Sequence, residues 1–231
     1  MSERMTVSTP EGSFSAYVAR PKASKAPAVV AIQEIFGVNA VMRQVCDQLA
    51  AAGDLAVAPD LFWRLEPGVD ITDQSKAEWD KAFDLMNRFD VDQGVEDIAA
   101  TIAQARQDPG CNGKVGAVGY CLGGRLAFLT ATRTDSDASV AYYGVGIDAY
   151  LAEAERLAHP LMLHIAEEDS FVPKEAQARI IAALKDHPLV TIHTYPGREH
   201  AFARPGGEHF HQGDAELANG RTRDFLAQHL A

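Results

Sequence analysis

The chain has 231 residues, a length that suits one α/β domain with an ample hydrophobic core. Its hydrophobic content of 47% and charged content of 23% are ordinary for a soluble globular protein, and its net charge of -11 argues against nucleic acid and anionic membrane surfaces as partners. The chain has three cysteines, no apolar stretch of membrane-spanning length and no signal peptide at its start, so we expect a cytoplasmic protein with free thiols.

Strands and helices alternate along the chain after an opening hairpin. The expected strands are residues 5–7, 14–18, 28–33, 55–58, 115–118, 139–143, 160–165 and 189–195. The expected helices are residues 39–52, 75–88, 91–107, 122–132, 148–157, 173–185 and 215–230. This alternation predicts a single α/β domain over residues 1–231, with a mostly parallel central sheet and helices on both faces.

The most informative stretch is KVGAVGYCLGG at residues 114–124. A short apolar strand runs into Cys121, and a helix follows directly. Gly119 and Gly123 stand two residues before and two residues after the cysteine, as a very tight strand-to-helix turn requires. This layout is typical of the nucleophile elbow of the α/β-hydrolase fold, with cysteine in place of serine. The positive end of the helix favours a thiolate, whereas the alternative interpretation is an inert buried cysteine.

Two later loops offer partners for the thiol. Asp169 follows the strand at residues 160–165, and His200 follows the strand at residues 189–195. The order nucleophile, acid, histidine at the carboxyl ends of strands is that of a catalytic triad in this fold. His200 would hold the cysteine as a thiolate, and Asp169 would orient the imidazole. The neighbouring glutamates leave open that the acidic loop is only solvated surface.

The remaining histidines do not form a metal site. His209 and His211 look like a metal-binding pair, but no third ligand accompanies them at a sensible spacing. Histidines within or beside regular elements, such as His164, are expected to be core or surface residues. We therefore expect no metal.

Five segments of the chain together resemble the dienelactone hydrolase (carboxymethylenebutenolidase) family. They are QEIFG at 33–37, GYCLGG at 119–124, AYYGVG at 141–146, DSFVP at 169–173 and HAFAR at 200–204. The resemblance spans nearly the whole chain. It implies hydrolysis of the enol-lactone ring of dienelactone (4-carboxymethylenebut-2-en-4-olide) to maleylacetate, in the breakdown of catechols or chlorocatechols, and it implies no cofactor.

The resemblance also implies roles for residues beside the thiol. Glu34 resembles the glutamate that takes part in activating the cysteine when the anionic substrate arrives. The backbone N–H groups of Leu122 and Ile35 look like the oxyanion hole. A carboxylate that only caps or pairs locally is the alternative for Glu34.

The chain departs from the family pattern at the substrate pocket. Members of the family hold substrate with an arginine and a tyrosine where this chain has Trp79 and Phe83, and Ala201 replaces a common serine. Arg204 keeps the other carboxylate-binding position. The expected substrate contacts are Arg204, Phe36, Trp79, Phe83, Tyr142 and Phe202. Such a pocket could also accept a larger or less charged ester.

These features predict an enzyme that acts on a small lactone or ester, expected to be anionic, and that is a monomer or a weak oligomer. A broader carboxylesterase or thioesterase on the same scaffold is the first alternative. A non-catalytic small-molecule binding protein is the second.

Overall fold

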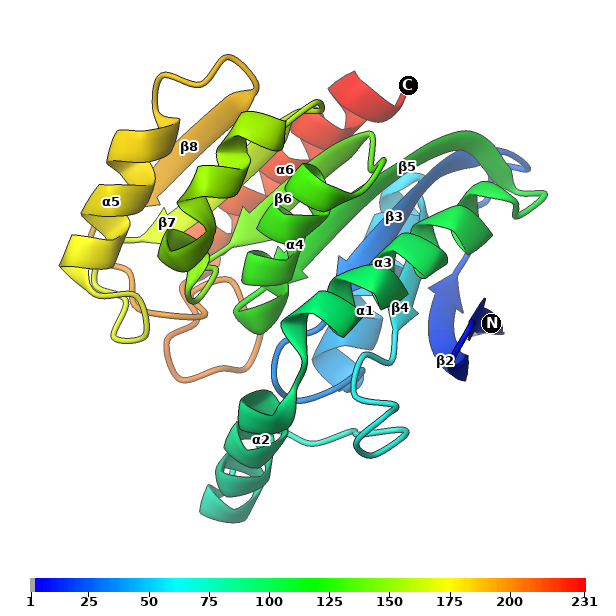
Figure 1. Ribbon diagram of the computed structural model, residues 1–231, viewed down its shortest axis with the longest axis horizontal. Helices are drawn as coiled ribbons and strands as arrows, with labels where there is room; N and C mark the ends of the chain where they lie inside the picture. The colour runs from blue at the N-terminus through cyan, green and yellow to red at the C-terminus, as the bar shows by residue number, and fades with distance from the viewer. Residues whose placement is uncertain (1–2) are drawn as a thin grey trace. The chain divides into compact units, whose positions relative to one another are not determined.

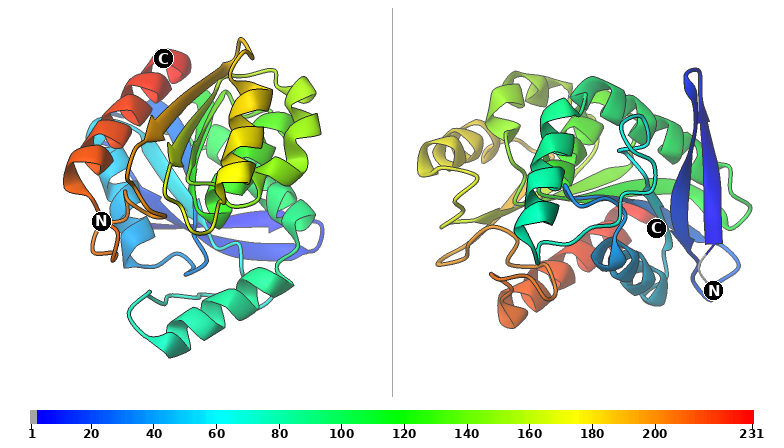
Figure 2. Two further views of the ribbon diagram at one scale, coloured as in Figure 1. Left: turned by 90° about the vertical axis from the view of Figure 1, so that its left-hand side faces the viewer. Right: turned by 90° about the horizontal axis from the view of Figure 1, so that it is seen from below.

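The computed structural model describes residues 3–231, which divide into two compact units. The first unit extends to Ala117. Its strands are β1 (Glu3–Thr9), β2 (Gly12–Ala19), β3 (Ala26–Ile32) and β4 (Leu55–Pro59), and its helices are α1 (Ala40–Ala52), α2 (Lys76–Arg88) and α3 (Val91–Arg106). Strand β2 pairs antiparallel with β1 and β4, whereas β3 pairs parallel with β4. Helices α1 and α3 cover opposite faces of these strands (Figure 2).

The expected helix ends in this unit follow from local capping. The side chain of Asn39 accepts a hydrogen bond from the backbone N–H of Met42 at 3.1 Å, which satisfies a donor in the first turn of α1. Gly53 ends α1 with a φ of 117°, in the left-handed region that glycine adopts most easily. Ser75 caps α2 in the same way as Asn39 caps α1.

The second unit runs from Val118 to Ala231, and strand β5 (Cys111–Tyr120) contains the boundary between the units. Its other elements are α4 (Leu122–Arg133), β6 (Ala138–Tyr142), the 3-10 helix η1 (Ile147–Arg156), β7 (Leu161–Ala166), α5 (Lys174–Leu184), β8 (Val190–Tyr195) and α6 (Gln212–Leu230). Strand β7 pairs parallel with β6 and β8. Helix α6 lies on one face of these strands, and α4, η1 and α5 lie on the other (Figures 1 and 2).

The hydrogen-bonded strand order is β1-β2-β4-β3-β5-β6-β7-β8. The expected α/β architecture with a mostly parallel sheet is confirmed, while the single domain remains a prediction. Two elements differ in detail from the expected ones. Strand β5 begins four residues before the expected strand at 115–118, and the expected helix at residues 148–157 is a 3-10 helix. No helix within residues 3–231 has both the length and the apolar character needed to span a membrane.

Candidate active site

Cys121 occupies a sharp turn between β5 and α4. Its φ of 58° and ψ of -115° are a strained combination for a residue with a side chain. A Cβ atom on Gly119 would lie 1.9 Å from the carbonyl oxygen of Gly123, so position 119 accepts only glycine. The structure therefore has the elbow geometry that the two glycines predict.

The neighbouring strand fixes the elbow from the side. The backbone N–H of Cys121 donates to the carbonyl oxygen of Tyr142 at 3.1 Å. A Cβ atom on Gly124 would approach that same oxygen to 2.4 Å, and one on Gly144 would lie 2.9 Å from the backbone nitrogen of Arg125. The start of α4 and the end of β6 are thus in backbone contact at glycines, a constraint that the sequence motif does not reveal.

Asp169 and His200 form a buried acid–base pair. The Nδ1 atom of His200 lies 2.9 Å from Oδ2 and 3.1 Å from Oδ1 of Asp169. The carboxylate is held in turn by the backbone N–H groups of Phe171 and Val172, which donate to Oδ1 at 2.8 and 3.2 Å. Because the carboxylate is fixed by its own loop, the imidazole that it holds is also fixed.

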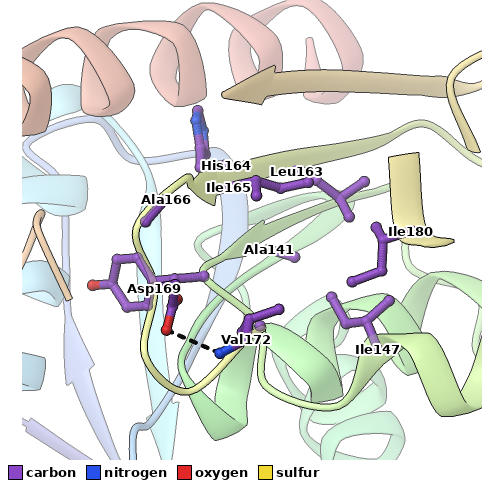
Figure 3. Close-up of a pocket in the computed structure, with 11 residues that line it drawn as sticks. Ala141, Ile147, Leu163, His164, Ile165, Ala166, Asp169, Val172 and Ile180 are labelled. Carbon is purple, nitrogen blue, oxygen red and sulfur yellow. Dashed lines mark hydrogen bonds between the residues drawn. The ribbon is translucent and has the colours of Figure 1, made fainter. Parts of the chain in front are cut away.

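An apolar wall supports the loop that carries Asp169. Figure 3 shows this loop beside side chains that include Ala141, Leu163 and Ile180, with the hydrogen bond between Asp169 and Val172 dashed. The hollow there has a volume of about 10 Å³, close to the minimum for one water molecule. It is too small to hold a substrate.

His200 also hydrogen-bonds Cys121. Asp169 occupies Nδ1, which leaves Nε2 for the sulfur. Burial lowers the pKa of His200, but negative charge on Cys121 and Asp169 outweighs burial and raises this pKa from 6.5 to about 10.

Backbone strain concentrates at this constellation. Within residues 3–231, the non-glycine residues with positive φ are Cys121, Tyr143 at 36° and Ala201 at 61°. Ala201 follows His200 directly, and the ring of Tyr143 packs edge-on against that imidazole with centroids 5.1 Å apart. Strain of this kind persists only where the surroundings enforce it, and it clusters at functional sites.

A family model described as the dienelactone hydrolase family matches residues 14–230. The chain belongs to the dienelactone hydrolase family. Members of this family are hydrolases, so the chain is an enzyme and the alternative of a non-catalytic binding protein is not supported.

Several relatives of known name match almost the full length of the chain. The "Putative carboxymethylenebutenolidase" of Azospirillum brasilense is 53% identical over 231 residues, covering 95% of each chain. The carboxymethylenebutenolidase of Pseudomonas putida is 40% identical over 228 residues, covering 98% of this chain and 97% of its own. A crystal structure titled "Putative Dienelactone Hydrolase from Klebsiella pneumoniae subsp. pneumoniae MGH 78578" superposes with a TM-score of 0.86 at 25% identity, covering 99% of this chain and 98% of that one.

Two predicted substrate contacts of this dienelactone hydrolase family member are core residues. Tyr142 is fully buried, and its hydroxyl forms hydrogen bonds with Thr222 and Asn219. Phe202 is also fully buried and packs against Tyr143 and Tyr195. We therefore assign Tyr142 and Phe202 to the core rather than to substrate binding.

Two aromatic residues that the sequence did not single out lie against His200 instead. They are Tyr143 and Phe171, whose rings lie 5.1 and 4.8 Å from that of His200. Phe171 is 42% exposed. Their positions in the sequence could have indicated a place at the site. Tyr143 directly follows β6, Phe171 lies in the loop that carries Asp169, and ligands of parallel sheets bind at the carboxyl ends of strands.

Arg204 lies in the loop after His200 and is partly buried. Its backbone N–H donates to the carbonyl oxygen of Ala201 at 2.9 Å, so a single turn connects it to the strained residue beside the histidine. A Cβ atom on Gly207 would lie 3.0 Å from its Nε atom. The side chain is therefore packed against its own loop.

The other predicted site residues belong to the first unit. Glu34, Ile35 and Phe36 follow β3 and are at most 4% exposed. The ring of Phe36 meets Trp79 edge-on with centroids 5.1 Å apart, and Trp79 stacks on Phe83 at 5.4 Å. We call Phe36, Trp79 and Phe83 the α2 aromatic cluster. Within the described part of the chain, no group of three or more histidine, cysteine, aspartate or glutamate side chains could hold a metal ion.

Proposed function

We propose that this hydrolase opens the enol-lactone ring of dienelactone to maleylacetate through a thiol ester on Cys121. The observation that carries the proposal is the linked series of Cys121, His200 and Asp169 at the start of α4. Relatives named carboxymethylenebutenolidase support the choice of substrate.

In the first half of the reaction, the sulfur of Cys121 attacks the lactone carbonyl carbon. A carbon–sulfur bond forms, and the ring carbon–oxygen bond breaks. The leaving enolate oxygen takes the proton from the imidazolium of His200, and the enol then tautomerises to the ketone. Asp169 stabilises the imidazolium and keeps its orientation without accepting the proton.

In the second half, His200 removes a proton from water, and the resulting hydroxide attacks the thiol ester. The carbon–sulfur bond breaks, and the sulfur leaves as the thiolate, so the starting charge pair is restored with the imidazolium. The product forms as the carboxylic acid of maleylacetate, which releases its proton to solvent and leaves as the carboxylate. Both half-reactions pass through a tetrahedral oxyanion.

Backbone N–H groups would stabilise that oxyanion. Leu122 is the first residue of α4, and the first N–H groups of a helix have no acceptor within the helix. The family resemblance adds the N–H of Ile35 as the second donor. Loss of one such donor typically costs a hundredfold to a thousandfold in turnover.

Glu34 is proposed, again from the resemblance, to assist activation of the thiol. The variant Glu34→Gln keeps the size of the side chain and removes its charge. We expect turnover to fall more than substrate binding weakens, because the charge acts in the chemical step. Unchanged turnover with an unchanged pH profile would reduce Glu34 to a structural role.

A broader carboxylesterase activity is the second candidate. The α2 aromatic cluster favours it, because apolar rings stand where other family members carry an arginine and a tyrosine. Initial rates on cis-dienelactone, trans-dienelactone and a panel of neutral esters separate the two functions. Higher kcat/KM on a dienelactone supports the main proposal, and higher kcat/KM on neutral esters supports the alternative.

Cys121→Ala tests the nucleophile whatever the substrate. We expect this variant to lose turnover, and mass spectrometry of the wild-type enzyme mixed with substrate should detect the acyl group on Cys121. Wild-type turnover in Cys121→Ala would show that the nucleophile is a different group.

A further inference from the structure

Gln33 is a fully buried polar residue directly after β3. Its side-chain amide joins two backbone segments. Oε1 accepts a hydrogen bond from the backbone N–H of Leu61 at 3.0 Å, and Nε2 donates to the carbonyl oxygen of Glu34 at 3.3 Å. The orientation of the amide follows from these partners, because an N–H can only donate and a carbonyl oxygen can only accept. An apolar side chain would avoid the cost of burying an amide, so a glutamine at this position calls for a role.

The backbone around Leu61 is a firm anchor for Gln33. Leu61 follows β4, the strand that pairs parallel with β3. The N–H of Asp60 donates to the carbonyl oxygen of Ser15 at 3.0 Å, and the N–H of Phe62 donates to Oδ1 of Asp60 at 3.2 Å. The chain is thus held on both sides of Leu61, and Gln33 ties the end of β3 to this fixed point.

The bond from Gln33 to Glu34 fixes the plane of one peptide group. The carbonyl of Glu34 and the N–H of Ile35 belong to the same peptide unit, which is trans, so the two groups point in opposite directions. Holding the carbonyl against Gln33 therefore aims the N–H away from Gln33. A hydrogen bond accepted by the carbonyl also polarises the peptide and strengthens its N–H as a donor.

The N–H of Ile35 is a buried donor. Within residues 3–231 it has no hydrogen-bond acceptor, although Ile35 is only 3% exposed. The chain after it is held as well: the carbonyl oxygen of Phe36 accepts from the N–H of Ile71 at 3.2 Å, and a Cβ atom on Gly37 would lie 2.0 Å from the carbonyl oxygen of Val69. A buried N–H of this kind costs free energy, and its fixed direction suits it to accept a group from a ligand.

We propose that Gln33 positions the N–H of Ile35 as an oxyanion donor. The inference rests on the proposed function, in which the N–H groups of Ile35 and Leu122 stabilise the oxyanion that forms when Cys121 attacks the carbonyl carbon. Gln33 acts through the peptide group between Glu34 and Ile35 and is therefore a positioning residue. Because the oxyanion develops only during the chemical step, Gln33 contributes to kcat and hardly to substrate binding.

The test is Gln33→Met, which keeps the approximate length of the side chain and removes both hydrogen bonds. The substrate is the dienelactone isomer or neutral ester that the wild type hydrolyses fastest. We expect kcat to fall by about tenfold to a hundredfold, less than for loss of an entire oxyanion donor, while KM hardly changes.

Alkylation of Cys121 by iodoacetamide is the second measurement. The sulfur displaces iodide from an alkyl carbon in this reaction, so no oxyanion forms. At alkaline pH, the rate of alkylation in Gln33→Met should therefore equal that in the wild type. Peptide mass spectrometry assigns the label to Cys121 and separates it from Cys46 and Cys111. A general disturbance of the site would slow alkylation together with turnover.

Thr101→Val is the matched control. It also removes a buried side-chain hydrogen bond from the first unit, the one that Oγ1 of Thr101 donates to the carbonyl oxygen of Asp97 at 2.8 Å within α3, and it should leave kcat unchanged. If Gln33→Met does not fold by circular dichroism, Gln33→Asn provides the same comparison. Its amide is one methylene shorter, so it cannot reach both Leu61 and Glu34 where they now lie.

Wild-type kcat in Gln33→Met would overturn the role of Gln33, and so would equal losses in kcat and in the rate of alkylation. The proposed function fails on a different result, namely full turnover in Cys121→Ala. The two failures are therefore distinguishable.

Discussion

The Nδ1 atom of His164 lies 2.7 Å from the hydroxyl oxygen of Tyr195, and Arg221 donates to that same oxygen from 3.2 Å. Because a guanidinium can only donate, the proton of the tyrosine hydroxyl is directed to His164. His164 is then neutral, with its proton on Nε2, and donates to Thr222 at 3.0 Å. This assignment of the tautomer follows from the network.

The network continues to the end of β6. The hydroxyl of Thr222 donates to that of Tyr142 at 2.6 Å, and Tyr142 donates to Asn219 at 3.0 Å. Every hydrogen bond in this network is donated in the same direction, from Arg221 towards Asn219. Because both of these residues lie on α6, the network fastens this helix to the strands of the second unit.

The first prediction concerns stability in acid. Burial, with smaller effects from His193 and Arg221, holds the pKa of His164 well below 6.5. The stability that the neutral imidazole contributes is fully present above about pH 6.5 and is lost as pH falls towards the lower folded-state pKa, with a limiting slope of about 1.4 kcal/mol per pH unit. Urea unfolding as a function of pH should show this slope in the wild type.

His164→Gln should be less stable at neutral pH but should lack that slope. His209→Gln, at an exposed histidine, is the control and should behave like the wild type. Parallel stability curves for wild type and His164→Gln would contradict the prediction.

The second prediction ranks the members of the triad. His200→Ala should lower turnover by orders of magnitude, because no other group accepts and returns the proton. Asp169→Asn should cost less than His200→Ala, since the carboxylate orients and stabilises the imidazole without transferring the proton. Steady-state kinetics on one substrate gives the ranking, and a larger loss in Asp169→Asn than in His200→Ala would refute it.

The third prediction concerns substrate charge. A protein of net charge -11 repels anions at long range, so a carboxylate-bearing lactone needs a cation in the pocket, and Arg204 is the proposed one. Arg204→Met should raise KM for an anionic lactone by about tenfold or more, as expected for a lost hydrogen bond to a charged group. KM for a neutral ester of similar size should hardly change. Equal losses on both substrates would mean that Arg204 supports its loop.

The fourth prediction concerns strain beside the histidine. Ala201 has a φ of 61°, which glycine adopts more readily. Ala201→Gly should therefore raise the free energy of unfolding by up to about 1 kcal/mol, while kcat falls because His200 is held less rigidly. Ala203→Gly, at a buried neighbour without positive φ, should destabilise the protein. Destabilisation by Ala201→Gly would contradict this prediction, because it would mean that packing of the Ala201 methyl group stabilises the protein by more than the backbone strain destabilises it.

The positions of Cys121, Asp169 and His200 could be predicted because each follows an expected strand and the three occur in the order that the fold requires. Glycines at 119 and 123 indicated the turn, since a side chain at 119 would overlap the backbone. The remaining contacts of the elbow could not be predicted. Gly124 is required by the approach of β6, a partner distant in sequence.

The sequence also could not show which of two adjacent tyrosines, Tyr142 or Tyr143, lies beside His200. Tyr142 was expected at the substrate, yet the positive φ of Tyr143 redirects the chain at that point. Tyr143 thereby reaches His200, and Tyr142 joins the network of His164. That network links three strands to α6, and its partners are up to 80 residues apart in the chain.

The tie between α6 and Tyr142 has a practical consequence for engineering. A protein truncated before Gln212 would lose Asn219, Arg221 and Thr222 together, leaving the hydroxyl of Tyr142 and the imidazole of His164 without these partners. The carbonyl of that same tyrosine receives the backbone N–H of Cys121. Removing α6, or exchanging it for an unrelated helix, would thus disturb the backbone around Cys121, the proposed nucleophile, through the opposite face of the sheet.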